Sequence, residues 1–395
     1  MTESSTAADF PIPAAQHQTY QVQPSGATAA VAALFTDDLI LEILSRVPAR
    51  SLHRFKCVSV LWRDLIADPA NRNMLPQTLS GFLHTSFCGS AYHHHFARVS
   101  GGVAPYDPSL PYLQPNKYKD MTQVDACNGF VLYRGCTKKV APWYRADEDC
   151  RFVVCNPTTG RWVELPPQPQ APAGRHSHIR GLAFDPAVSS SFHVLHFEEA
   201  YSSSMIGVSI YSSRTGAWSY RDSGMAEEVE LFSRTRCVFV GGVLYLIGFL
   251  PGINDDYVLL AVDMMGKVWK TIRVPYPRRF GMIGSSQGCL HYAISSVNEV
   301  ELWCLKDCDS KEWVLKHTSS IDKLMGMTVK NYRVIGIHPD CDTIFLVPCR
   351  GHTLIAYDMQ HQEVGCILDL EKNSTQRFLP YVPLFSESLA DANGR

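Results

Sequence analysis

The sequence predicts a multidomain chain in which a short all-α block of three helices precedes an all-β propeller, for which we expect six blades. Apolar residues recur at helical spacing within residues 34–66, and strand-like segments that share a Trp-bearing hairpin fill the chain after about residue 78. We therefore expect a disordered tail at residues 1–30, the helical block at 31–75, the propeller at 76–390 and a second tail at 391–395.

Capping residues stand where the helices of the block should begin. Thr36 and Ser59 are placed to cap the first and the third helix, the latter over residues 60–67. Ser51 is placed to cap a second helix over residues 52–57.

The first helix carries more apolar side chains than one internal contact requires. On a wheel of about 100° per residue they cover an arc of about 200°, whereas a helix that faces one core needs a stripe of about 100°. The residues of this arc are Leu39, Ile40, Leu41, Ile43, Leu44 and Val47. The arc predicts two contacts, one with the block's own helices and one with the propeller or another protein. The alternative is a helix enclosed on both sides within its own chain.

Each predicted blade contains an alternating apolar strand, a polar turn and, in four units, a Trp-bearing strand. These strands carry Trp162, Trp218, Trp269 and Trp313, and a fifth unit at residues 353–370 lacks the Trp. With the hairpins between them, the units have about four strands each, which is typical of propeller blades. We expect the Trp rings to be buried between blades, with the indole N–H bonded to the backbone.

The two ends of the strand-rich region predict how the propeller closes. Residues 80–87 and 377–389 are strand-like, and pairing them would build a sixth blade. Five or seven blades remain open as alternatives.

Composition points away from several classes of partner. The net charge of −2 gives no electrostatic footprint for nucleic acid or an anionic membrane. The most apolar later stretch, residues 237–252, is too short for a membrane helix. Residues 1–30 lack the pattern of a secretory signal, so we expect a cytoplasmic or nuclear location and read the 13 Cys as reduced thiols.

No catalytic motif is present. The sequence lacks a G-x-S-x-G elbow, a P-loop and an H-E-x-x-H helix, so we expect no catalytic residues and no cofactor. Residues 93–95, three histidines, are interpreted as a loop cluster rather than a metal site. Arg278, Arg279 and Phe280 have the composition of a binding surface, the alternative being a solvated connection between blades.

The run from Phe35 to Pro69 resembles the F-box family. The matching elements are Asp38–Leu39, Glu42–Ile43–Leu44, Arg46–Val47–Pro48, Ser51–Leu52, Arg54–Phe55, Cys57–Val58–Ser59, Trp62 and Leu65–Ile66. Phe35–Thr36 departs from the Leu-Pro that is usual at the start of the motif. The F-box followed by FVVCNPTTGRWVELP at residues 152–166 and by strand repeats resembles the plant F-box-associated, kelch-like proteins.

The resemblance implies a substrate receptor without catalytic function. An F-box docks on a Skp-type adaptor, which links it to a cullin and a RING protein in an SCF-type ubiquitin ligase, while the propeller holds a protein substrate. The implied adaptor contacts are Leu39, Ile43, Leu44, Val47, Pro48, Leu52, Val58 and Trp62. Trp62 is also a candidate for the block's internal core. A scaffold that acts with the adaptor outside a ligase, and a propeller enzyme, are the alternatives.

Overall fold

The structure is a computed structural model. It describes residues 36–47, 49–68, 70–71, 74–75, 78–88, 91–99, 105–113, 117–138, 150–168, 175–200, 204–232, 236–252, 256–296, 299–307, 311–320, 332–349, 352–370, 374–385 and 389. The tails predicted at residues 1–30 and 391–395 lie outside this part of the chain.

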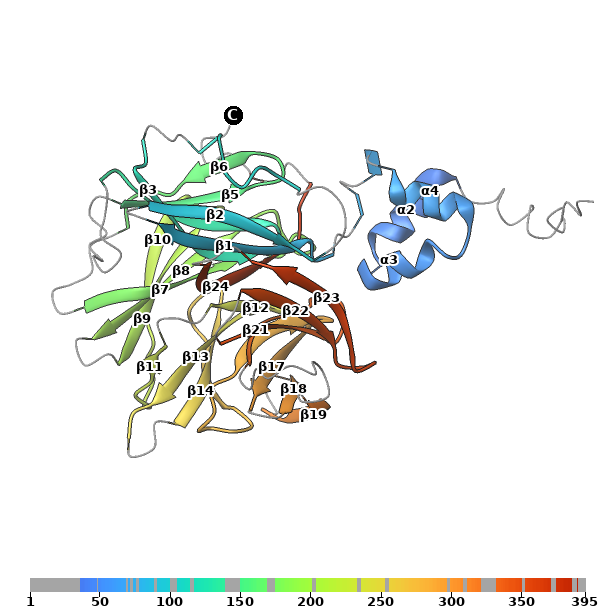
Figure 1. Ribbon diagram of the computed structural model, residues 1–395. Coiled ribbons are helices and arrows are strands. Elements are labelled where there is room, and N and C mark those ends of the chain that lie inside the picture. Colours follow the sequence, from blue (N-terminus) through green and yellow to red (C-terminus); the bar gives the residue numbers. More distant parts are fainter. Residues whose placement is uncertain are drawn as a thin grey trace, which may run out of the picture.

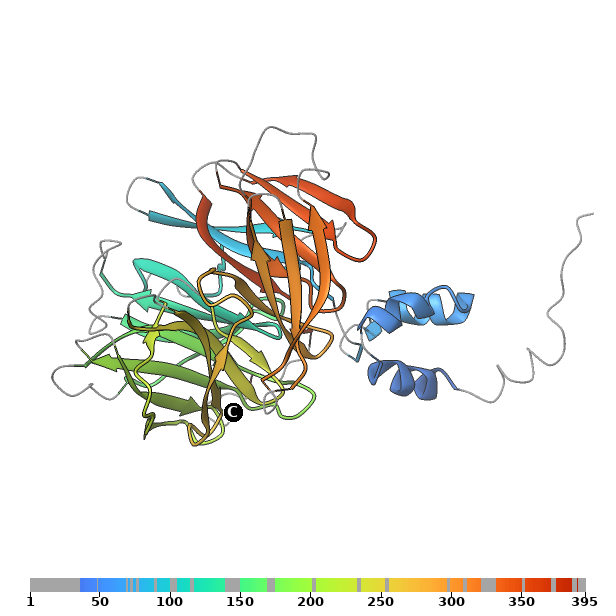
Figure 2. The ribbon, with the colours of Figure 1, turned by 90° about the horizontal axis from the view of Figure 1, so that it is seen from below.

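Within the described residues, three helices form a block. This block stands beside the sheets (Figures 1 and 2). The helices are α2 (Asp37–Ser45), α3 (Ala49–Phe55) and α4 (Val60–Ala67). The side chain of Thr36 accepts a hydrogen bond from the backbone of Leu39 at 3.4 Å, and Ser59 accepts one from Trp62 at 3.1 Å, so both predicted caps are confirmed. The predicted start of the second helix was wrong, because Ala49 and Arg50 are strong helix formers and leave Ser51 inside α3.

Six antiparallel sheets follow the helical block. The first contains β1 (Gly81–Cys88), β2 (Ala91–Arg98) and β24 (Ser374–Tyr381). The second contains β3 (Asp120–Cys127), β4 (Phe130–Cys136), β5 (Cys150–Asn156) and β6 (Arg161–Glu164). The third contains β7 (Arg175–Ala183), β8 (His193–Ala200), β9 (Met205–Ser212) and β10 (Ala217–Asp222).

The other three sheets complete the ring. The fourth contains β11 (Glu230–Leu231), β12 (Val238–Val240), β13 (Val243–Leu250), β14 (Asp256–Asp263) and β15 (Trp269–Arg273). The fifth contains β16 (Met282–Ser286), β17 (Cys289–Ser295), β18 (Glu299–Leu305) and β19 (Trp313–Ser320). The sixth contains β20 (Tyr332–Ile337), β21 (Thr343–Pro348), β22 (Thr353–Asp358) and β23 (Glu363–Asp369).

These sheets are the six blades of a propeller. The strands β3, β7, β12, β16, β20 and β24 each contact the next one, and β24 contacts β3, so they surround one axis. The prediction that the two ends of the region close the ring is confirmed, because β1 pairs with β24 and Gly81 lies opposite Tyr381.

Large side chains fill the space between neighbouring blades. Phe130 and Phe184 stack at 4.1 Å between the second and third blades. Trp218 and Trp313 donate their indole N–H to carbonyls of the preceding blade, at 3.0 and 2.8 Å. Trp269 bonds within its own turn. The four repeated Trp are half-buried rather than buried, which corrects the prediction, because they lie on the outermost strand of each blade.

The propeller has two distinct faces. We call the face at which the inner strands end the linker face, because β1 begins there opposite the end of β24. We call the opposite one the loop face. The linker is held at both ends, since Leu75 packs in the helical block and Leu79 in the propeller. The Thr78 hydroxyl donates to the Asp340 carboxylate at 2.7 Å.

Two cysteines that we expected to be free thiols are joined. Cys136 and Cys150 form a disulfide, so the expectation that all 13 Cys are reduced was wrong. The physical reason is the register of β4 and β5, which places these two residues directly opposite each other with a Cα–Cα distance of 4.1 Å.

Candidate functional site

The apolar arc of α2 divides into a buried half and an exposed half. Ile40, Leu41 and Leu44 pack into a core with α3 and α4. Leu39 and Ile43 lie outside that core and are 50% and 45% exposed. The surplus predicted by the wheel is therefore a surface that the block's own helices leave uncovered, and the alternative of full enclosure does not hold for these two side chains.

The turn before α4 and the first turn of α4 expose further apolar side chains. Val58, Val60 and Leu61 are 62%, 63% and 40% exposed. Trp62 instead packs on the core of the block, where its ring meets Phe55 edge to face with the ring centroids 5.2 Å apart. Two elements of the block thus present apolar groups to solvent.

Of the residues that the resemblance assigned to an adaptor contact, three have accessible side chains. They are Leu39, Ile43 and Val58. Val47 is half-buried, and Pro48 lies outside the described residues.

Two other assigned residues are buried: Leu44 has 0% and Leu52 has 3% exposure, because both fill the core between the helices. A side chain without exposed surface does not contact a partner while the block keeps this conformation. Trp62 is half-buried at the edge of that core, so its adaptor contact stays a prediction.

Sequence reasoning missed Val60 and Leu61. On a wheel of α4, the core residues Trp62, Leu65 and Ile66 lie within an arc of about 100°, and both missed residues fall outside it. The same wheel analysis that exposed the surplus of α2 would have found them.

The loop between β15 and β16 presents an aromatic surface on the loop face. Tyr276 and Phe280 are each 38% exposed. The Phe280 ring lies 4.9 Å from that of Phe232 and 5.5 Å from that of Tyr257. The Arg279 guanidinium lies 5.3 Å from the centroid of the Tyr276 ring. The predicted residues Arg278, Arg279 and Phe280 are thus exposed together in one ordered loop.

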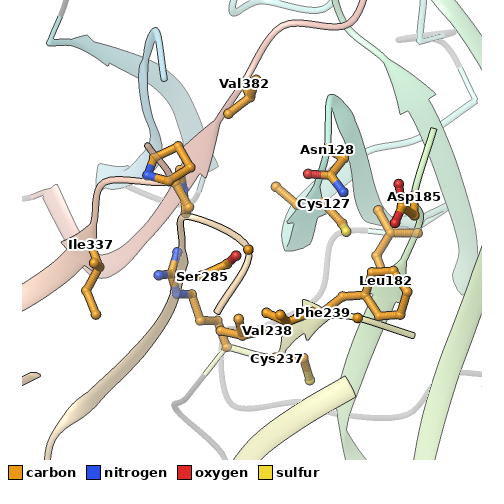
Figure 3. A pocket seen from close by; sticks show the side chains of 17 residues that line it. Cys127, Asn128, Leu182, Asp185, Cys237, Val238, Phe239, Ser285, Ile337 and Val382 are labelled. Atoms are coloured by element: carbon orange, nitrogen blue, oxygen red, sulfur yellow. The ribbon is translucent and has the colours of Figure 1, made fainter. Parts of the chain in front are cut away.

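A cavity of about 260 Å³ lies on the propeller axis at the linker face (Figure 3). Several polar groups that line it are bonded to the backbone of a neighbouring blade. Asn128 donates to the Phe184 carbonyl at 2.7 Å, and Arg236 donates to that of Ile283 at 3.2 Å. Burial raises the pKa of the Cys127 thiol well above its usual range, which keeps it protonated and a poor nucleophile. These groups join blades and do not form an acid–base pair.

The three consecutive histidines lie on β2 and not in a loop, which corrects the prediction. Burial and the neighbouring His95 lower the pKa of both His84 and His94 to about 4, so both rings are neutral at pH 7. Within the described residues, no cluster of three or more His, Cys, Asp or Glu is arranged to hold a metal ion. None of the described helices is long and apolar enough to cross a bilayer.

Comparison with known families identifies both parts of the chain. Residues 34–73 match the F-box domain. Residues 106–382 match the family described as F-box protein At3g26010-like, beta-propeller. This chain belongs to that family of F-box proteins.

Individual relatives agree with this assignment. F-box protein At1g47340 of Arabidopsis thaliana is 25% identical over 296 residues, which are 70% of this chain and 62% of the relative. F-box protein At5g49610 of the same plant is 24% identical over 332 residues, which are 79% of this chain and 84% of the relative. The chain therefore spans less than two thirds of the first relative and most of the second.

Membership of the family indicates what the exposed apolar side chains of the F-box could bind. An F-box implies binding to a Skp1-type adaptor. The uncovered half of α2 and the start of α4 are the parts of this F-box that offer apolar surface for such a contact.

Proposed function

We propose that this F-box protein is the substrate receptor of an SCF-type cullin–RING ubiquitin ligase. The observation that carries the proposal is the exposure of Leu39 and Ile43 on an F-box helix whose other large apolar side chains are buried in the block's core. Exposed apolar groups on a small, otherwise complete core are typical of a surface that a partner covers. The adaptor contact, in this proposal, consists of these residues with Val58, Val60 and Leu61.

The receptor acts by position and not by bond chemistry. The adaptor, cullin and RING protein bring a ubiquitin-charged enzyme near the propeller, and the propeller holds the substrate there. The rate rises because the substrate lysine is at high effective concentration near the thioester. The linker supports this role, since Leu75 and Leu79 fix it to both parts and would limit their relative motion.

Reconstitution tests the proposal. The full chain is co-expressed with a Skp-type adaptor, and a cullin–RING pair, a conjugating enzyme and ubiquitin are added. We expect a complex that contains this chain, the adaptor, the cullin and the RING protein. We also expect transfer of ubiquitin to lysines of the bound chain. The double variant Leu39→Asp/Ile43→Asp is the matched control and should lose both. A complex that holds the adaptor but excludes the cullin would favour a scaffold outside a ligase.

Separate measurements test the expected lack of catalysis, the location in the cell and the domain boundaries. The chain purified without ligase partners should show no hydrolase or transferase activity and no stoichiometric metal. A fluorescent fusion should appear in the cytoplasm or the nucleus, and the F-box at residues 31–75 and the propeller at 76–390 should give separate thermal transitions.

A further inference from the structure

The loop that carries Arg278 and Arg279 is held rigidly. Its backbone accepts two hydrogen bonds from the blades it joins, from the Tyr257 amide to the Pro277 carbonyl at 2.7 Å and from the Tyr292 hydroxyl to the Arg279 carbonyl at 3.0 Å. Pro275 and Pro277 restrict its backbone further. A rigid surface loses little conformational entropy on binding, which favours recognition.

The two arginines of this loop are available to a partner. Both are exposed, and neither forms an ion pair with a carboxylate among the residues that the structure describes. Two carboxylates on the strands β14 and β18 of the adjoining blades have other partners. Asp256 lies 3.9 Å from Arg273, and Glu301 accepts a hydrogen bond from Trp303, whose ring lies 6.0 Å from that of Tyr276.

We propose that this surface, made by Tyr276, Arg278, Arg279, Phe280 and Tyr257, is a docking site for an acidic linear peptide segment of the substrate. Carboxylates of the peptide pair with the guanidinium groups, which match them in a planar, forked geometry. An apolar side chain beside them packs on the exposed Phe280 ring. The inference rests on the proposed receptor function and names the chemistry of the substrate.

Charge complementarity favours an acidic peptide as the ligand of this surface. Two unpaired cations beside exposed rings suit one or two discrete carboxylates. A continuous phosphodiester backbone needs a broad basic field, which the net charge of −2 does not supply. The loop face is also the face opposite the attachment of the F-box.

A peptide selection tests the site. A library of random 12-residue peptides on phage is panned against the full chain bound to its adaptor, and the best binders are synthesised. We expect them to be rich in Asp and Glu, and to bind Arg278→Glu/Arg279→Glu about thirtyfold more weakly, as for a hot spot of about 2 kcal/mol. Phe280→Ala should weaken binding roughly tenfold. Replacing the Asp and Glu residues of the peptide with Gln should abolish binding to the wild-type chain.

The control variant carries the same change of charge as Arg278→Glu/Arg279→Glu, but on the linker face of the propeller. Arg214 and Lys267 are exposed in linker-face turns, and Arg214→Glu/Lys267→Glu should bind the peptides as wild type does. Selected peptides without acidic residues, no selected peptide at all, or equal binding to both double variants would overturn the inference. Adaptor and cullin binding, measured on the same preparations, reports on the proposed function separately.

Discussion

Replacing the exposed half of α2 gives the sharpest distinction between adaptor contact and internal core. Leu39 and Ile43 each expose about half of their surface, so each has roughly 1 kcal/mol of apolar transfer free energy to gain when a partner covers it. Leu39→Ala/Ile43→Ala should therefore weaken adaptor binding by about 2 kcal/mol, which is roughly thirtyfold. Leu39→Asp/Ile43→Asp adds the cost of burying carboxylates and should weaken it about a thousandfold or more.

Leu44 is the contrasting position on the same helix. Its side chain is completely buried, so Leu44→Ala should cost about 2–5 kcal/mol of F-box stability. Binding would then fall because the block unfolds. The exposed-side variants should leave the block folded, because they remove no internal contact.

The assay combines adaptor titration with amide hydrogen exchange of residues 37–67. The alanine and aspartate variants at Leu39 and Ile43 should keep wild-type protection of these amides, whereas Leu44→Ala should lose it. Wild-type affinity in Leu39→Asp/Ile43→Asp would refute the assignment of this surface. Loss of protection in that variant would show that the two side chains belong to the core.

Three further outcomes follow from the propeller. As pH falls below about 6.5, the unfolded chain protonates His84 and His94 before the folded chain does. The free energy of unfolding should therefore fall by about 2 kcal/mol for each histidine between pH 7 and pH 5. Equal melting temperatures at pH 7 and pH 5 would contradict this. Reductant should break the Cys136–Cys150 bond and lower the free energy of unfolding by up to about 3 kcal/mol, seen as a lower melting temperature. It should not affect Cys136→Ser/Cys150→Ser. Phe82→Ala, in the closing blade, should cost about 3–5 kcal/mol in a urea melt, and a loss below 1 kcal/mol would argue against ring closure there.

Much of this architecture could be predicted because it follows from local patterns. Thr36 and Ser59 cap helices through hydrogen bonds to nearby backbone, so their role is visible in the sequence. The repeated Trp revealed the blades because four of them repeat the same hairpin. The strands that close the ring could be found because they were unpaired ends of the same repeat.

The rest depends on orientation and register, which local patterns do not specify. The wheel of α2 showed an excess of apolar surface, but the side on which α3 and α4 pack decides that Leu44 is buried and Ile43 is exposed. Cys136 and Cys150 meet because β4 and β5 pair in one register across a connection whose length gives no hint of it. The exposed Val60 and Leu61 could have been found, since they depend only on the wheel of α4.

The order in which the chain enters the ring links the two proposed binding surfaces. Because β1 begins where the inner strands end, the F-box attaches at the linker face, and the Arg278–Phe280 loop lies on the other. A linker fixed at Leu75 and Leu79 would hold these surfaces in a defined relation. When a substrate docks through a peptide on this loop, only those lysines that lie at certain distances from the docked peptide would then reach the ubiquitin-charged enzyme. Lengthening the linker at residues 76–77 with flexible Gly-Ser insertions should therefore broaden the set of modified lysines without changing peptide affinity, which mass spectrometry of ubiquitylated products would reveal. An unchanged set would mean that the linker does not position the substrate.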